Sequence, residues 1–307
     1  MVNEQIKKTE GYGKIVVPDH YNYLAVFLTF FCPRECSYCL NEQGDGLQQR
    51  QIVDGKEWMA ALNRLETKLP ITFNGGEPLS HPGFFEIVNG LDERLKVDML
   101  TTLPYDVQEF IENLNPERFE RDLPYGAIRV TYHPETMDLE ETIGKVRRIK
   151  EAGFNIDMNL VDNPKNKEEA KLTKEKIIAA GLECVIKPFL GYLDEKLYGQ
   201  FRYAESCSME SRKDVKCQTT QLLIDPKGNV YRCYGDLFRQ NPDGVLGNIF
   251  DPEVDLTVRD TECNNFGFCH PCDVQIKFDR FSKWDYAAVE IKGKGITKVH
   301  KSTVDWG

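Results

Sequence analysis

Short apolar runs alternate with helical patterns throughout residues 23–189, and this alternation restricts the fold more than any other feature of the chain. Between the runs, apolar residues recur at intervals of three and four, as at Trp58, Leu62 and Leu65, which predicts amphipathic helices. Strands that alternate with helices are typical of a parallel sheet covered by helices. The six predicted strands are 23–31, 70–73, 97–103, 127–133, 154–161 and 182–189.

The number of predicted strands argues against a closed barrel. Eight β/α units would need about 250 residues, and only six units fit into residues 23–189. We therefore predict an α/β fold, a partial (β/α)6 barrel that is open on one side. Active sites of such sheets lie at the carboxyl ends of the strands, so residues that follow the strands are the candidates for function.

The pattern changes after residue 189. The tract 217–274 carries cysteines and two short predicted strands around residues 225–229, but few helical faces. We expect a small α+β domain that buries little apolar surface and is held together by a metal centre. The predicted organisation is an N-terminal extension (1–22), the barrel (23–190), a linker (191–216), this second domain (217–274) and a C-terminal tail (275–307).

The net charge and the length of the apolar stretches indicate which classes of partner the protein can bind and where in the cell it lies. The 39 basic and 49 acidic residues give a net charge of −10, which argues against a broad nucleic-acid-binding surface. The longest apolar stretch, residues 23–32, is far shorter than the ~20 residues that cross a bilayer, and the N-terminus lacks an apolar signal core. We therefore expect no membrane partner and a cytoplasmic location. Ten cysteines in such a chain indicate metal ligands or catalytic thiols rather than disulfides.

Three of these cysteines, Cys32, Cys36 and Cys39, directly follow the first predicted strand. Thiolates at this spacing can bind three irons of a [4Fe-4S] cluster and leave the fourth iron without a protein ligand. An open position on a metal usually serves a substrate or a cofactor. The alternative is a structural zinc site, which would need a fourth Cys or His nearby. The nearest in sequence, His20, lies on the other side of the strand.

The C-x3-C-x-aromatic-C segment after the first strand and the Gly75-Gly76-Glu77-Pro78 turn after the second together resemble the radical S-adenosylmethionine (SAM) superfamily, over residues 23–189. The resemblance implies that the open iron binds the amino and carboxylate groups of SAM. It implies that an electron from the cluster then cleaves SAM to methionine and a 5′-deoxyadenosyl radical. It also implies that the turn contacts the methionine amine through Glu77 and backbone carbonyls, which glycine permits by close approach. Alone, such a turn is explained equally well as a tight connection between strand and helix.

Further SAM contacts follow from the resemblance at the ends of other strands. Tyr38 corresponds to an aromatic residue that packs near adenine. Thr101 and Thr102 end the third strand, where ribose or carboxylate ligands lie. Each has a structural alternative, because a tyrosine beside a cluster can serve packing alone and β-branched residues favour strands.

Polar residues also occupy one face of the fourth and fifth predicted strands. Arg129, Thr131 and His133 share a face by the two-residue period, as do Asn155, Asp157 and Asn159. Polar side chains inside a barrel are costly unless they bind water or a ligand. We therefore expect Thr131, His133 and Asn159 to contact SAM or substrate. Alternatively, His133 marks a strand end and the polar face of the fifth strand meets solvent.

A second set of cysteines lies in the second predicted domain. It resembles the twitch domain, a short form of the SPASM extension that many radical SAM enzymes carry. The resemblance implies one auxiliary [4Fe-4S] cluster, and the closest match to its ligand order is Cys217, Cys233, Cys269 and Cys272. A zinc ribbon is the alternative, because four cysteines with a C-x2-C pair also suit zinc.

Three cysteines then have no assigned ligand role, namely Cys184, Cys207 and Cys263. A free thiol near the substrate can donate a hydrogen atom to a carbon radical, so Cys207 and Cys263 are candidate catalytic donors. Either could instead replace one of the four auxiliary ligands. A small buried hydrophobic residue is the alternative, particularly for Cys184 on the sixth strand.

Together these features predict a radical SAM oxidoreductase or epimerase that abstracts hydrogen from a C–H bond of a small polar metabolite, such as a sugar-like natural product. A flavodoxin or ferredoxin-type carrier would supply the electron. Peptide modification is the alternative reaction class, but residues 1–22 leave no room before the barrel for a leader-recognition domain. The alternatives of another class are a non-catalytic iron–sulfur electron carrier and a zinc-binding module, neither of which needs an open iron beside the glycine turn.

Overall fold

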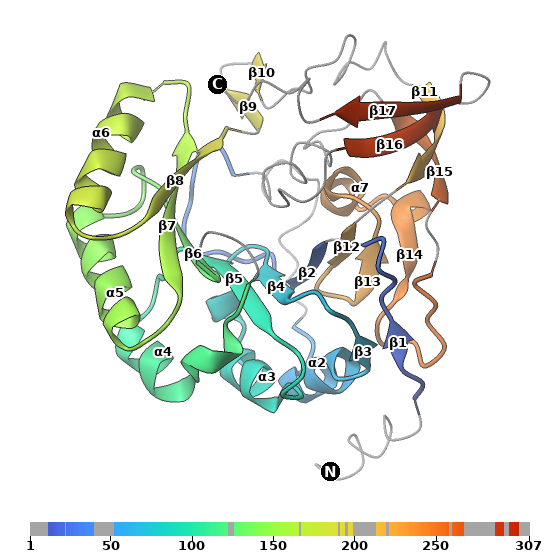
Figure 1. Ribbon diagram of the computed structural model, residues 1–307, viewed down its shortest axis with the longest axis horizontal. Helices are drawn as coiled ribbons and strands as arrows, with labels where there is room; N and C mark the ends of the chain where they lie inside the picture. The colour runs from blue at the N-terminus through green and yellow to red at the C-terminus, as the bar shows by residue number, and fades with distance from the viewer. Residues whose placement is uncertain are drawn as a thin grey trace.

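One large sheet organises the chain (Figure 1). The computed structural model describes residues 12–21, 23–39, 52–121, 126–165, 167–189, 191–193, 196–198, 213–218, 221–257, 260–266, 286–291 and 295–300. The sheet has nine strands in the order β14-β13-β12-β2-β4-β5-β6-β7-β8. Their bounds are β2 (Tyr23–Phe27), β4 (Ile71–Asn74), β5 (Val97–Thr101), β6 (Ile128–Tyr132), β7 (Ile156–Asp162), β8 (Cys184–Pro188), β12 (Gln221–Ile224), β13 (Asn229–Tyr231) and β14 (Val245–Asn248).

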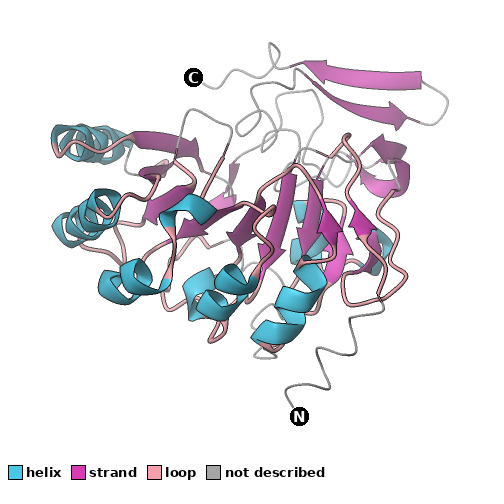
Figure 2. Ribbon diagram, turned by 60° about the horizontal axis from the view of Figure 1, so that its bottom comes forward, coloured by secondary structure: helices cyan, strands magenta, loops and turns pink. Residues whose placement is uncertain are grey.

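Helices follow the parallel strands and cover one face of the sheet (Figure 2). They are α2 (Gly55–Leu62), α3 (Phe84–Gly90), α4 (Val107–Asn113), α5 (Leu139–Glu151) and α6 (Lys167–Ala179), with short 3₁₀ turns η2 (Pro78–Ser80) and η3 (Pro116–Arg118). Strands β2 and β4 to β8 pair in parallel, each with the next. These six strands are the six predicted from the sequence, and the predicted α/β partial barrel is confirmed.

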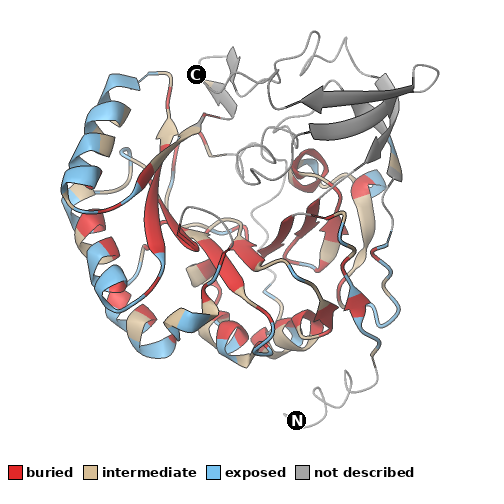
Figure 3. Ribbon diagram, in the orientation of Figure 1, coloured by how far each residue is buried: buried red, intermediate tan, exposed pale blue. Residues whose placement is uncertain are grey.

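The two faces of the barrel strands differ in chemistry because side chains alternate along each strand. Residues such as Met99, Val130 and Met158 are fully buried in the core beneath the helices, whose outer sides are exposed (Figure 3). The opposite face carries the polar residues that the two-residue period predicts. It includes Asp157 and Asn159, which are both buried. The alternative that this face of the fifth predicted strand meets solvent is therefore wrong for these two residues and right for Asn155, which is exposed just before β7.

Charged groups on the polar face pair with one another near the amino ends of the strands. The carboxylate of Asp98 on β5 accepts from Arg129 on β6 at 3.2 Å and also forms an ion pair with Arg121. All three side chains are buried, so each charge needs its partner. Arg129, which lies on the same face as Thr131 and His133, therefore belongs to this ion-pair cluster.

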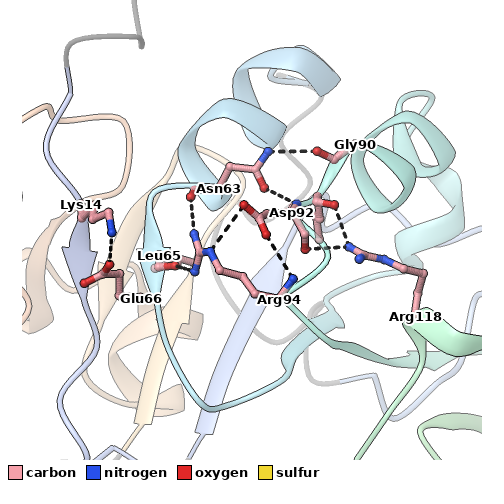
Figure 4. Close-up of polar contacts among 9 residues, drawn as sticks. Lys14, Asn63, Leu65, Glu66, Gly90, Asp92, Arg94 and Arg118 are labelled. Carbon is pink, nitrogen blue, oxygen red and sulfur yellow. Dashed lines mark hydrogen bonds and ion pairs between the residues drawn. The ribbon is translucent and has the colours of Figure 1, made fainter.

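Side chains also close the amino-terminal edge of the barrel, between the helices and the strands that follow them (Figure 4). Asn63, just after α2, donates to the carbonyl of Gly90 at 2.9 Å and accepts from the backbone of Asp92 at 2.7 Å. Arg94 donates to the carbonyl of Asn63 at 2.7 Å, and Arg118 donates to Leu91 at 2.9 Å. These contacts stabilise the end of the barrel opposite the carboxyl ends of the strands.

The hairpin of β12 and β13 extends the barrel sheet. Strand β12 runs parallel to β2, with Gln221 opposite Tyr23 and Ile224 opposite Val26, and β13 and β14 continue the sheet in antiparallel order. Helix α7 (Tyr234–Arg239) and the 3₁₀ turn η5 (Pro242–Gly244) connect β13 to β14.

The expectation that the cysteine-bearing tract buries little apolar surface is wrong for its described residues. Leu222, Ile224, Val230 and Ile249 are fully buried in the same core as the barrel helices, and Phe250 packs against Trp58 of α2 at 5.0 Å between ring centroids. The sequence does not indicate this burial, because the apolar residues that cover the tract belong to the barrel and are distant in the chain. The division of the chain at residues 190 and 217 stays a prediction.

The remaining strands form smaller sheets. A two-stranded parallel sheet pairs β1 (Ile15–Val16) with β3 (Leu65–Glu66), and β9 (Gly191–Leu193) pairs with β10 (Lys196–Tyr198). A four-stranded sheet has the order β15-β11-β16-β17. Its strands are β11 (Lys213–Gln218), β15 (Asp260–Phe266), β16 (Tyr286–Ile291) and β17 (Gly295–His300). Within the described residues, no helix is both long and apolar enough to cross a membrane.

The shared core predicts that the hairpin and the barrel unfold together. Leu222→Ala should lower the free energy of unfolding by about 2–5 kcal/mol, because it leaves a cavity between β12 and the barrel. Urea titration followed by circular dichroism should show one transition with a lower midpoint. The matched control is Leu172→Ala on α6, where the side chain is 59% exposed and little should change. An unchanged midpoint of the helical signal in Leu222→Ala would contradict a shared core.

Candidate functional site

The three predicted cluster cysteines lie in one loop at the carboxyl end of β2, which we call the cysteine loop (residues 32–39). Cys36 is buried, and Cys32 and Cys39 are half-buried. The amide of Cys39 donates to the carbonyl of Cys36 at 3.1 Å and closes a turn, while the amide of Arg34 donates to the sulfur of Cys32 at 3.4 Å. The loop therefore keeps all three thiols at the edge of the sheet where the strands end.

Burial controls the protonation of two of these thiols. It raises the pKa of Cys32 to about 11, and the negative charges of Glu77 and of the other two cysteines add to the rise. Burial also raises the pKa of the Cys36 thiol, against a lowering by the hydroxyl of Thr136. Without a cation these two thiols are thus held protonated. Soft sulfur donors that need a positive centre to become thiolates fit an iron–sulfur cluster by their chemistry.

The geometry of the thiols is looser than that of a formed metal site. Among the described residues, no three Cys, His, Asp or Glu side chains gather closely enough to hold a metal ion. The structure therefore brings the three cysteines into one loop and does not test their assignment as ligands. That assignment stays a prediction.

The glycine turn after β4 is packed directly against the segment that leads into the cysteine loop. The amide of Gly76 donates to the carbonyl of Thr29 at 3.0 Å. The amide of Glu77 donates to the carbonyl of Phe31 at 2.9 Å. A Cβ on Gly76 would lie 2.2 Å from the carbonyl oxygen of Phe31, and Gly75 has a φ of +130°. Glycine is therefore required here because two backbones meet, whatever ligand the turn also contacts.

Glu77 is fully buried, and its carboxylate is surrounded by donors from the end of β5 and from η2. It accepts from the hydroxyl of Thr101 at 2.7 Å, from the amide and hydroxyl of Thr102 at 2.7 and 2.9 Å, and from the amide of Leu79 at 3.2 Å. Burial nonetheless raises the pKa of this carboxyl, because desolvation outweighs the four hydrogen bonds. The structure thus brings together three predicted SAM contacts, Glu77, Thr101 and Thr102, through bonds to one another. Pro78 follows at the buried start of η2.

Tyr38 and His133, both predicted to contact SAM, also meet. The hydroxyl of Tyr38 lies 3.0 Å from Nδ1 of His133, and its ring packs edge-on against Phe189 with centroids 5.5 Å apart. Tyr38 is buried and its pKa is raised by burial. Burial and then the nearby charge of Arg34 lower the pKa of His133 to about 4, so its ring is neutral at pH 7.

The other two predicted contacts are neighbours on adjacent strands. Thr131 on β6 is directly opposite Asn159 on β7 in the parallel register. Thr131 is half-buried and Asn159 is 4% exposed. Both lie on the polar face, on the carboxyl side of the Asp98–Arg129 pair. The structure therefore places the predicted SAM-binding residues at or beyond the carboxyl ends of β2, β4, β5 and β6, except Asn159, which lies in the middle of β7.

The second set of cysteines is described only in part. Cys207, Cys269 and Cys272 lie outside the described residues. Cys217 lies on β11 opposite Thr261, and Cys263 lies on β15 opposite Val215, so β11 and β15 carry one cysteine each. Cys184 on β8 is buried, and burial raises the pKa of its thiol to about 11.

Cys233 is held by a buried ion pair at the start of α7. Its sulfur accepts from the amide of Asp236 at 3.4 Å and donates to the Asp236 carboxylate at 3.2 Å. That carboxylate also pairs with Nε of Arg232 at 2.6 Å, and Arg232 in turn donates to the carbonyl of Glu262 on β15. The backbone next to Cys263 is therefore tied to the residue that precedes Cys233.

Sequence reasoning missed the residues that hold the cysteine loop from the side. Arg34 donates to the carbonyl of Thr136 at 2.7 Å, and the amide and hydroxyl of Ser37 both donate to the carboxylate of Glu135 at 2.9 Å. Glu135 and Thr136 follow His133 directly after β6. Their position at a strand end was the available signal, but nothing local indicates that the cysteine loop packs there.

Comparison with known sequences gives one partial match. No protein-family model matches the chain. A GTP 3′,8-cyclase from Chlorobaculum tepidum is 33% identical over 86 residues, a match that covers 28% of this chain and 24% of that protein. The chain therefore aligns with about a quarter of the length of this curated relative.

Solved structures show the same fold. The structure of anSMEcpe with bound AdoMet matches with a TM-score of 0.50 over 75% of this chain and 76% of that chain, at 14% identity. Streptococcus suis SuiB bound to the precursor peptide SuiA matches with a TM-score of 0.52 over 82% of this chain and 66% of that chain, also at 14% identity. These likenesses show that the chain shares its fold with both proteins.

The close approach of the glycine turn predicts a specific sensitivity. Gly76→Ala should lower the free energy of unfolding by about 1–3 kcal/mol, because the new Cβ forces the backbone of residues 30 and 31 to move. Gly144→Ala in α5 is the control, since nothing lies within 4 Å of its Cβ position and alanine favours a helix by roughly 0.5–1 kcal/mol. Urea unfolding measures the free energy of unfolding of both variants. If the two variants change stability in the same direction, the turn is not constrained as described.

Proposed function

We propose that this chain is a radical SAM enzyme that reductively cleaves S-adenosylmethionine and uses the 5′-deoxyadenosyl radical to abstract hydrogen from a C–H bond. One observation carries the proposal. The segment that leads into the cysteine loop and the Gly75–Pro78 turn, which the sequence separates, are joined by the amides of Gly76 and Glu77 at the carboxyl ends of neighbouring strands. An electron carrier or a zinc module would not need the two motifs side by side.

The residues at the strand ends have separate tasks in this proposal. Cys32, Cys36 and Cys39 would hold a [4Fe-4S] cluster. When bound, the cluster supplies the electron for SAM cleavage and an open iron for the amino and carboxylate groups of SAM. The protein's part is to position SAM and to exclude water.

The SAM-binding role extends to the bonded residues around the loop. Backbone carbonyls of Gly75 and Gly76, with Glu77, would receive the methionine amine, and Thr101 and Thr102 hold the Glu77 carboxylate in place for that contact. The rigid carboxyl group suits a cation, because four donors orient it and a positive charge beside it would offset the burial that raises its pKa. Tyr38, Thr131, His133 and Asn159 would line the remainder of the SAM or substrate site.

We further propose one auxiliary [4Fe-4S] cluster on Cys217, Cys233, Cys269 and Cys272. The bond from Arg232 to Glu262 on β15 supports a shared site for Cys233 and Cys217, because β15 pairs with β11, where Cys217 lies opposite Thr261. Such a cluster can accept an electron from a substrate radical, which completes an oxidation by two electrons. Cys207 or Cys263 could instead donate a hydrogen atom, which completes an epimerisation. A flavodoxin or ferredoxin-type protein would deliver the electron that starts the reaction.

A small polar metabolite is the proposed substrate class. The partial relative supports it, because a GTP 3′,8-cyclase is named for a nucleotide, which is a small polar molecule. A peptide is the second candidate. One observation favours it, because SuiB was solved with a precursor peptide and anSMEcpe with a Cp18Cys peptide.

The function is tested by removing the cluster ligands. Replacing Cys32, Cys36 and Cys39 together by alanine should abolish 5′-deoxyadenosine formation and leave about four irons on the auxiliary cluster, out of about eight in the wild-type protein. Cys184→Ala is the control, because this buried thiol lies outside the loop. Persistent 5′-deoxyadenosine in the triple variant would refute the assignment, and zinc without iron in the wild-type protein would favour a zinc module.

The auxiliary ligands are tested in the same way. Replacing Cys269 and Cys272 together by alanine should lower the iron content by roughly half and leave SAM cleavage in place, because the other cluster keeps its three thiolates. Iron analysis and the electron paramagnetic resonance signal of the reduced protein measure this. An iron content equal to that of the wild-type protein would show that the ligand choice is wrong.

A further inference from the structure

The cysteine loop is bound along its length by the turn that follows β6, residues 133–137, which we call the β6–α5 turn. Three contacts hold the loop by its polar side chains. Arg34 donates to the carbonyl of Thr136, Ser37 donates twice to Glu135, and Tyr38 meets His133. None of these three contacts involves a sulfur atom.

A fourth contact reaches a thiol. The hydroxyl oxygen of Thr136 lies 3.7 Å from the sulfur of Cys36, within the range of a hydrogen bond to sulfur. The position of Thr136 is fixed independently of this bond, because its amide donates to the carbonyl of His133 at 3.1 Å and its carbonyl accepts from Arg34 at 2.7 Å. The hydroxyl is therefore presented to Cys36 by a rigid turn.

The direction of this hydrogen bond changes with the state of the sulfur. A thiol can donate or accept, but a thiolate bound to iron can only accept, so Thr136 must donate to it. Hydrogen bonds to cysteine sulfurs are among the factors that set the reduction potential of an iron–sulfur cluster. A donor favours the state with one more electron, because it places partial positive charge beside the sulfur.

We propose that Thr136 is a positioning residue for the cluster, whose hydroxyl donates a hydrogen bond to the sulfur of Cys36, restrains the cysteine loop and raises the reduction potential of the cluster. This inference rests on the proposed function for the presence of the cluster. It goes beyond it by assigning a role to a residue outside the cysteine loop and outside the glycine turn.

Two substitutions at Thr136 and one on the loop separate the hydrogen bond from packing. Thr136→Val keeps the shape and removes the donor, whereas Thr136→Ser keeps the donor. Ser37→Ala is the matched control, since it removes a neighbouring hydroxyl that bonds to Glu135 and not to sulfur. If Thr136→Val unfolds, as judged by circular dichroism, Thr136→Ala takes its place.

The first measurement is the midpoint potential of the SAM-responsive cluster, from a redox titration followed by electron paramagnetic resonance. We expect a more negative potential in Thr136→Val and wild-type potentials in Thr136→Ser and Ser37→Ala. A wild-type potential in Thr136→Val overturns the proposal. An equal shift in Ser37→Ala overturns it as well, because the effect would then come from the position of the loop and not from the bond to sulfur.

The second measurement uses the protein without iron and does not depend on the cluster. The rate of hydrogen–deuterium exchange at the amides of the cysteine loop, read by mass spectrometry, should rise roughly fivefold in Thr136→Val, as expected for the loss of one hydrogen bond that holds the loop. The amides of β8 around buried Cys184 serve as the internal reference. An unchanged rate overturns the restraint of the loop by Thr136. A wild-type protein that binds no iron would refute the proposed function, while this rate would still report on the contact.

Discussion

Two backbone hydrogen bonds, from Gly76 to Thr29 and from Glu77 to Phe31, determine the geometry of the candidate site. They join the ends of β2 and β4 at a separation that leaves no space for a Cβ on either glycine. The carbonyls that accept them belong to the segment that continues into Cys32. The position of the cysteine loop therefore depends on the glycine turn, and two motifs that are far apart in the sequence form one structural unit.

From this unit, polar contacts extend to the two neighbouring strands. The buried carboxylate of Glu77 connects it to the end of β5 through Thr101 and Thr102, and the cysteine loop connects it to the β6–α5 turn. The polar groups of the site are thus largely satisfied by one another at the carboxyl edge. At the other end of the polar face, Asp98 is neutralised by Arg129. A ligand at the carboxyl edge would meet side chains whose orientations are already determined, which favours binding without large rearrangement.

The sequence predicted the features that depend on local patterns. Hydrophobic periodicity located the six barrel strands, and the two-residue alternation correctly predicted that Asp157 and Asn159 share one face of their strand, opposite buried Met158. Contacts between distant segments could not be derived in this way. Nothing in the tract around Gln221 indicates that its partner is β2, and nothing around Thr136 indicates that it meets Cys36. Short apolar tracts such as residues 221–224 carry no information about which strand they join.

The pairing of β12 with β2 changes how the second set of cysteines relates to the first. Cys233 directly follows β13, which is two strands away from β2 in one continuous sheet, and the same β2 leads into the cysteine loop. The orientation of Cys233 is determined by the buried Arg232–Asp236 ion pair. Arg232 also donates a hydrogen bond to a backbone carbonyl of β15. The cysteine loop and, of the second set, Cys233 are therefore positioned from the same sheet. A cluster at Cys233 would be held at a separation from the cysteine loop that the sheet determines, whereas a flexible linker between two domains would leave that separation variable.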